Sequence, residues 1–350
     1  MGPMRLRRSS ATLLGLLLLG STLSACSEET GGIEVGDVVP ARQDAQFEGE
    51  GVESVVALPI GQLEVTAGAP VTEVSAKDTR QLEKLQAPEG SVFVPITWQY
   101  DAATFGALAA YISTEATPAI DLVADGASYR LPAPEQTGEG AESFYVLVQG
   151  DGDEPRLEVD FDGVTQQVDL TSGEVEAGRA EALYDLPKPR TKRLPCAGDT
   201  SYSRAAVRAA RFACSTTRPF RLPYAGTGWA EDGGTWLVVT VRTTLGLWNE
   251  VAQDLKSGAV YYADGITGTF RLGDTEAAAV IKDPRNTACP DRTDQGSCTG
   301  EFHVVFAAKR KHPRTLTIEH DYSLRLASAW GGKQAEEVLD LSVTAHARLS

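Results

Sequence analysis

Apolar and polar residues alternate along most of the chain beyond residue 51, in runs of strand length separated by Gly, Pro and Asp-Gly turns. Residues 92–98 and 237–241 are clear examples, with a valine, isoleucine, leucine or tryptophan at every second position. A period of two places one face of a strand in a core and leaves the other for water or a second contact. The pattern predicts an all-β protein.

Four strand-like motifs occur twice in the same order. The first half contains SVFVPI (91–96), ADGASYRL (124–131), FYVLV (144–148) and PRLEV (155–159). The second half contains WLVVTV (236–241), ADGITGTFRL (263–272), FHVVF (302–306) and PRTLTI (313–318). A repeated order of motifs in a 350-residue chain indicates a duplication of one domain. We therefore predict two tandem β-sandwiches, at residues 52–172 and 194–350, joined by a linker at 173–193.

The amino-terminal segment has the pattern of a secretory signal. Arg5, Arg7 and Arg8 precede an apolar run at residues 11–20, and small residues follow at 21–25. The apolar run is shorter than the roughly 20 residues that a membrane-spanning helix needs. We expect residues 1–25 to direct export, and no later stretch is apolar for long enough to predict a transmembrane helix.

The end of this signal, Leu23-Ser24-Ala25-Cys26, resembles the lipobox of bacterial lipoproteins. The resemblance implies that Cys26 becomes the first mature residue and carries lipid, which would hold the protein on the extracytoplasmic face of the cell membrane. The alternative is a secreted protein with a chance cysteine at this position. Residues 26–51 are polar, acidic and Gly-containing, so we expect a disordered tether.

The remaining cysteines, Cys196, Cys214, Cys289 and Cys298, all lie in the second half. An even number in an exported chain predicts two disulfides. Of the three pairings, we favour Cys196 with Cys214 and Cys289 with Cys298, since each closes a short insertion relative to the first copy. Zinc is the competing explanation, but no Cys-x-x-Cys motif occurs and no histidine has ligand-like spacing to these cysteines. We expect neither a metal nor a cofactor.

Charge is divided unevenly along the chain, whose formal net charge is −16. Residues 27–186 hold 31 acidic and 7 basic residues, whereas residues 187–350 hold 17 and 22. The acidic balance argues against a general nucleic-acid binder. The basic stretch between Lys188 and Arg221 contains a predicted short helix at 201–212.

This helix would place Arg204, Arg208 and Arg211 on one face. Such a face is a candidate anion-binding site. Its partner would be an acidic cell-wall polymer, lipid headgroups, another envelope protein or the acidic first half of the chain. A merely solvated face is the remaining explanation.

The lipobox and the repeated motifs together resemble actinobacterial surface lipoproteins that carry tandem immunoglobulin-like extracellular domains. The resemblance covers roughly residues 52–350 and implies a β-sandwich fold; it does not specify a ligand. The oligomeric state stays open.

The sequence contains no Gly-x-Ser-x-Gly, phosphate-binding Gly-rich loop or His-Glu-x-x-His motif. It therefore favours a non-catalytic binding or structural module of the cell envelope. The alternatives are a wall-polymer hydrolase with carboxylates on sandwich loops and a carrier with an apolar cavity between its sheets.

Overall fold

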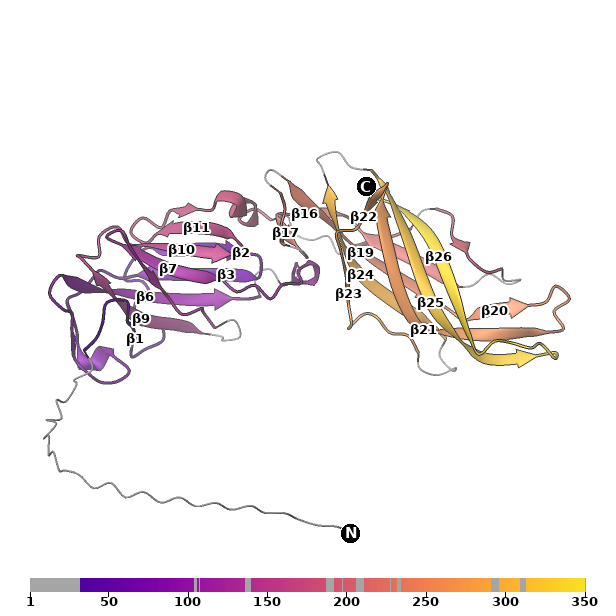
Figure 1. Ribbon diagram of the computed structural model, residues 1–350, viewed down its shortest axis with the longest axis horizontal. Helices are drawn as coiled ribbons and strands as arrows, with labels where there is room; N and C mark the ends of the chain where they lie inside the picture. The colour runs from indigo at the N-terminus through magenta and orange to yellow at the C-terminus, as the bar shows by residue number, and fades with distance from the viewer. Residues whose placement is uncertain are drawn as a thin grey trace, which may run out of the picture.

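The computed structural model describes residues 32–103, 106, 108–135, 140–186, 192–196, 198–205, 211–226, 228–231, 234–290, 296–308 and 313–349. The protein is all-β, and its antiparallel sheets form two sandwiches that follow one another along the chain (Figure 1). The predicted fold class is therefore confirmed. Within the described residues, no helix is both long enough and apolar enough to cross a membrane.

The first sandwich contains two five-stranded sheets. One has the order β1 (Val38–Pro40), β9 (Ala141–Gln149), β6 (Ser91–Asp101), β3 (Gly61–Ala67), β2 (Glu53–Leu58). The other has the order β12 (Val175–Glu176), β11 (Val164–Asp169), β10 (Arg156–Phe161), β7 (Ala119–Ala124), β8 (Ala127–Arg130). Alternate residues of both sheets meet in one core, in which Trp98 is 1% exposed. The alternation in the sequence thus reflects a two-sheet core.

The second sandwich is built in the same way with longer strands. One sheet has the order β13 (Arg193–Pro195), β15 (Phe212–Thr217), β19 (Thr235–Leu245), β24 (Cys298–Ala308), β23 (Ala279–Lys282), and β16 (Phe220–Leu222) also pairs with β19. The other has the order β14 (Ser201–Tyr202), β26 (Val338–Arg348), β25 (Thr315–Trp330), β21 (Gly258–Leu272), β20 (Trp248–Val251), and β22 (Thr275–Glu276) pairs with β21.

The strand order is immunoglobulin-like in both sandwiches. In the second, β15-β19-β24-β23 corresponds to the A-B-E-D sheet and β21-β25-β26 to the C-F-G sheet. In the first, β3-β6-β9 and β7-β10-β11 pair in the corresponding order. Three of the four repeated motifs fall on corresponding strands of the two sandwiches, namely β6 and β19, β9 and β24, and β10 and β25. The internal repeat seen in the sequence is therefore also a repeat of strand pairing.

The second repeated motif differs between the two copies. Asp125 and Gly126 have φ angles of 50° and 77° and form the tight turn between β7 and β8. Asp264 and Gly265 instead lie inside the 15-residue strand β21, at a register shift opposite β25. The prediction of an Asp-Gly turn in the second copy is therefore wrong. Strand β21 pairs with the long β25 on both sides of this position, so the two residues form a bulge within the strand and not a turn.

The predicted disordered tether at 26–51 is wrong for the described residues from 32 onward. Val38–Pro40 forms β1, which pairs with β9 through three residues. Phe47 is 4% exposed, and its N–H donates to Thr97 Oγ1 at 3.1 Å. The few apolar residues of this polar segment cover the outer face of the first sheet. Backbone pairing along an existing sheet edge orders a segment that has too few apolar residues to fold alone.

Part of the predicted linker at 173–193 is also ordered structure. Val175–Glu176 forms β12, and Gly178–Leu183 forms the 3-10 helix η3, which packs against Ala57 and Val164. Tyr184 accepts a hydrogen bond from Ala57 N–H at 3.1 Å and donates one to Gln166 at 2.7 Å. The chain therefore stays attached to the first sandwich until close to residue 186.

Acid should destabilise the second sandwich through His320. Its side chain is fully buried on β25, stacks on Phe302 and donates from Nδ1 to Thr267 O at 3.1 Å. Burial lowers its pKa to about 4. In the unfolded chain the ring has a pKa near 6.5. As the pH falls from about 6.5 toward 4, the ring therefore binds a proton in the unfolded chain but stays neutral in the folded one.

The folded state should therefore lose about 3 kcal/mol across this window. Chemical unfolding at pH 7 and pH 4.5 would measure the loss. The His320→Leu variant, which cannot titrate, should show a smaller difference between the two pH values. Equal differences in parent and variant would show that His320 is not responsible.

Candidate functional site at the domain junction

The two sandwiches interlock through side chains that cross the junction in both directions. From the first, Tyr111 follows β6 in the 3-10 helix η2 (Ala109–Tyr111) and is 5% exposed. Its ring packs edge-on against Phe220 and His303, with ring centroids 5.2 and 5.1 Å away. Its hydroxyl lies 2.6 Å from Thr240 Oγ1 and its carbonyl accepts from Gly226 N–H at 2.7 Å. Tyr111 is thus bound to the outer face of the second sandwich.

From the second sandwich, the small hairpin β17 (Tyr224–Ala225) and β18 (Gly228–Trp229) packs into the core of the first. Tyr224 is 2% exposed, and its ring meets Phe161 and Trp229 edge-on. Trp229 Nε1 donates to Phe161 O at 2.8 Å, and the Tyr224 hydroxyl donates to Asp162 at 3.0 Å. Figure 1 places β17 between the two sandwiches. Each domain therefore completes a buried surface of the other.

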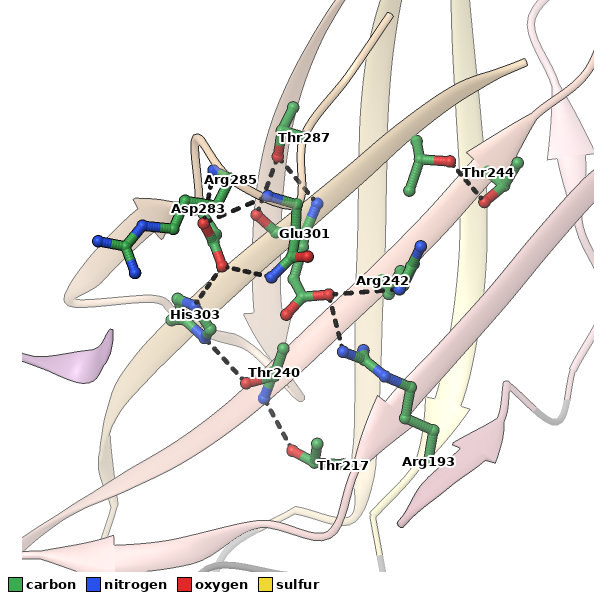
Figure 2. A network of polar contacts seen from close by, with 12 residues as sticks. Arg193, Thr217, Thr240, Arg242, Thr244, Asp283, Arg285, Thr287, Glu301 and His303 are labelled. Carbon is green, nitrogen blue, oxygen red and sulfur yellow. Dashed lines mark hydrogen bonds and ion pairs between the residues drawn. The ribbon is translucent and has the colours of Figure 1, made fainter. Parts of the chain in front are cut away.

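A polar network lies beside Tyr111 on the outer face of the β13-β15-β19-β24-β23 sheet (Figure 2). Phe302 and Val304 of β24 point into the core, so the intervening His303 and the preceding Glu301 point outward. Asp283 follows β23, and its N–H donates to Glu301 O at 2.9 Å. The three side chains therefore sit at neighbouring positions of one antiparallel ladder.

Glu301 is the only carboxylate among the fully buried described residues, at 4% exposure. Its Oε2 is 2.7 Å from Arg193 Nη2 and 3.9 Å from Arg242 Nη1. A carboxylate this well buried needs a nearby positive charge, because desolvation otherwise makes its ionised form costly. Arg193, on the edge strand β13, provides the closer one.

His303 connects this carboxylate cluster to the domain junction. Its Nδ1 lies 2.9 Å from Thr240 Oγ1, the atom that also contacts the Tyr111 hydroxyl. The side chain is 9% exposed, and burial lowers the pKa of its ring although Glu301 and Asp283 act in the opposite direction. The ring is therefore neutral at pH 7. Its Nε2 is 3.7 Å from Asp283 Oδ2.

Asp283 is held by the turn that follows β23. Its Oδ1 accepts from Arg285 N–H at 2.8 Å, and its Oδ2 accepts from Asn286 Nδ2 at 2.8 Å. Burial raises the pKa of this carboxyl, but these hydrogen bonds outweigh it and the net pKa is lowered. Asp283 is therefore ionised at neutral pH and fixed in orientation.

The predicted arginine face is wrong for its described members. Ser201–Tyr202 forms β14 and Phe212 begins β15, so neither end of the predicted helix at 201–212 is helical. Both ends are strands because their backbone groups pair with β26 and β19. A short helix without tertiary contacts is only marginally stable, so this pairing is favoured over the helix. The centre of that helix, including Arg208, lies outside the described residues.

Arg204 and Arg211 consequently have different environments. Arg204 Nε contacts Glu250 Oε1 at 2.7 Å, and Lys333 Nζ contacts the other oxygen at 3.2 Å. This cluster borders an open depression of about 590 Å³ with Ser203 and Ser257 on its wall. Arg211 is exposed immediately before β15. Arg204 is thus paired within its own domain and not with the acidic first domain.

Both favoured disulfide pairings are present. Cys196 is bonded to Cys214 and Cys289 to Cys298, with sequence separations of 18 and 9 residues. The first joins the segment after β13 to β15, and the second closes the loop that leads into β24. Cys26 lies outside the described residues.

Loss of either disulfide should weaken only the second sandwich. Closing loops of these lengths is worth about 3 kcal/mol each in the chain-entropy model. Thermal unfolding of the paired Cys196→Ser/Cys214→Ser and Cys289→Ser/Cys298→Ser variants would measure it, with tryptic mapping under non-reducing conditions to verify the links. An equal loss of stability in the first sandwich would contradict the prediction.

Sequence reasoning missed the network of Asp283, Glu301 and His303. The signal was present, because Glu301 and His303 are ionisable residues at alternate positions, and the residues of the strand from Phe302 onward are otherwise apolar. Spacing between histidines and cysteines does not reveal this site, because the partners of His303 are carboxylates. Tyr111 carried no signal in its local sequence. Comparison with protein-family models and with curated protein sequences finds no match to this chain.

Proposed function

We propose that the protein is a lipid-anchored, extracytoplasmic module of the cell envelope that acts by binding or supporting other envelope components and not by catalysis. The observation that carries the proposal is the interlocked junction. Tyr111 is fixed on the second sandwich and Tyr224 lies in the core of the first. A pair of sandwiches joined in this way acts as one stiff unit, which suits a spacer or a display scaffold better than an enzyme that closes around a substrate.

Membrane attachment in this proposal depends on Cys26, as the resemblance of residues 23–26 to a lipobox implies. The folded part begins close to the anchor, since β1 starts at Val38. The first sandwich would therefore stand near the membrane and the second farther from it.

A wall-polymer hydrolase is the competing function, and the nearest carboxylate pair does not favour it. Asp283 has a lowered pKa and Glu301 is paired with Arg193. A glycosidase of the usual kind needs one carboxyl group with a raised pKa to protonate the leaving group. Asp283, whose pKa is lowered, therefore does not fit the role of that proton donor.

Membrane fractionation of the Cys26→Ser variant tests the anchor. We expect the parent chain in the membrane fraction and the variant in the soluble extracytoplasmic fraction. The paired Cys289→Ser/Cys298→Ser variant is the control and should remain in the membrane. Retention of Cys26→Ser at the parental level would overturn the proposed anchoring.

Sedimentation with purified cell wall tests the binding role. An electrostatic partner should retain the protein at low salt and release it at high salt. Arg211→Glu should reduce retention, because Arg211 is exposed, while Lys77→Glu at an exposed position of the first sandwich is the control. Turnover of wall polymer by the purified protein would instead establish the hydrolase.

A further inference from the structure

We infer that Asp283, Glu301 and His303 form a binding site for one divalent transition-metal ion at the domain junction. One ligand atom from each residue lies within 4.8 Å of the others. The donor set is one imidazole nitrogen and two carboxylate oxygens. This inference goes beyond the proposed function, because it concerns metal binding, although His303 also packs against Tyr111 at the junction.

The distance between the side chains of His303 and Asp283 points to a metal ion that both of them bind. Nε2 and Oδ2 are 3.7 Å apart, which is too far for a hydrogen bond. Two atoms that each lie about 2.1 Å from one ion, at an angle of roughly 110–120°, are about 3.4–3.6 Å apart. The observed separation therefore fits two ligands of one ion better than it fits a donor and its acceptor.

Each of the three side chains is held by a second partner, as metal ligands in proteins usually are. His303 contacts Thr240 through Nδ1, which directs Nε2 toward Asp283. Asp283 Oδ1 accepts from the backbone of Arg285. The described ion pairs of Glu301 both use Oε2, which leaves Oε1 for a ligand.

The backbone positions hold the two carboxylates of the site close together. Asp283 and Glu301 are joined by a ladder hydrogen bond of 2.9 Å, so two negative side chains lie opposite one another. Like charges at such positions are destabilising. Arg193 and Arg242 both lie beside Oε2 of Glu301, whereas the described ion-pair partner of Asp283 is His303. A cation between Oδ2 of Asp283 and Nε2 of His303 would add a positive charge on that side of the site.

The donor set selects the class of ion. Ca²⁺ and Mg²⁺ prefer sites made only of oxygen, whereas imidazole with carboxylates suits Zn²⁺ or Mn²⁺. The affinity should follow the usual order, with Zn²⁺ bound more tightly than Mn²⁺. A metal at this site would also join β23 and β24 next to Tyr111 and so stiffen the junction.

Isothermal titration with Zn²⁺, Mn²⁺ and Ca²⁺ separately tests the inference on the full chain, purified in detergent without a polyhistidine tag and stripped with a chelator. We expect one Zn²⁺ per chain, weaker Mn²⁺ binding and no Ca²⁺ binding. His303→Gln and Asp283→Asn should each weaken Zn²⁺ binding at least tenfold. His346→Gln is the matched control, since His346 lies on β26 away from the carboxylates, and should bind as the parent does.

The Arg193→Gln variant should change Zn²⁺ affinity in the opposite direction to His303→Gln and Asp283→Asn. Removing the positive charge beside Glu301 should tighten Zn²⁺ binding and enlarge the rise in melting temperature that Zn²⁺ produces. Circular dichroism of each stripped variant would verify that it is folded before titration. Absence of Zn²⁺ binding by the parent, or equal weakening by His346→Gln and His303→Gln, would overturn the inference.

Discussion

Replacing Tyr111 by alanine should release the two sandwiches from each other. The tyrosine is 5% exposed, and it packs against Phe220 and His303 and contacts the hydroxyl of Thr240. Truncation of a large buried aromatic side chain costs about 3–5 kcal/mol. Tyr111 belongs to the first domain, whereas the residues that it packs against belong to the second. The lost free energy therefore weakens the contact between the two sandwiches more than it weakens the core of either one. Small-angle scattering should report a larger and more variable distance between the sandwiches.

Tyr111→Phe is the matched control for this change. It keeps the ring contacts and removes only the hydroxyl that meets Thr240, which should cost about 1 kcal/mol. Its scattering curve should stay close to that of the parent. If Tyr111→Ala also keeps the parental curve and melting profile, the junction does not depend on this residue.

Replacing Tyr224 by alanine should destabilise the first sandwich, although the residue lies in the segment of the chain that forms the second sandwich. Its ring is 2% exposed and packs edge-on against Phe161 of β10. The change leaves a cavity in the core of the first sandwich and removes the hydrogen bond to Asp162. We expect a loss of about 3–5 kcal/mol. Hydrogen exchange should speed up in β10 and in β11, its partner strand.

Tyr224→Phe separates the two contributions. It retains the packing on Phe161 and loses only the contact with Asp162, so we expect a loss of about 1 kcal/mol. Faster exchange confined to the second sandwich in Tyr224→Ala would contradict the proposed interlock. The same reasoning predicts that the first sandwich, expressed without the β17–β18 hairpin, is less stable than in the full chain.

Local pattern predicted the strands well and the connections poorly. The alternation at 92–98 and 237–241 lies in β6 and β19, and the four cysteines pair as their spacing suggested. These features depend on near neighbours in the chain. The ordered segment at 38–40 was missed because its support comes from distant residues, namely a ladder to β9 about 100 residues away and a hydrogen bond from Arg80 N–H to Pro40 O.

The failed helix at 201–212 has a related cause. Alanine-rich sequence favours a helix when the segment is isolated. Here Ser201–Tyr202 pairs with β26 and Phe212 with the end of β19, and a disulfide ties the segment to its neighbour. Tertiary partners override a weak local preference at such positions, so propensity alone could not place the arginines.

The sequence by itself determined that the protein is all-β and that its strand motifs repeat, and it favoured the two cysteine pairs that the structure contains. Each of these follows from periodicity or from short spacing, which act over a few residues. Only the tertiary structure decided that Tyr111 reaches Thr240, that Tyr224 completes the other domain's core, and that Asp283, Glu301 and His303 converge. The two domains meet through residues 62 to 129 positions apart, and no local pattern encodes which surfaces become buried when two folded sandwiches dock.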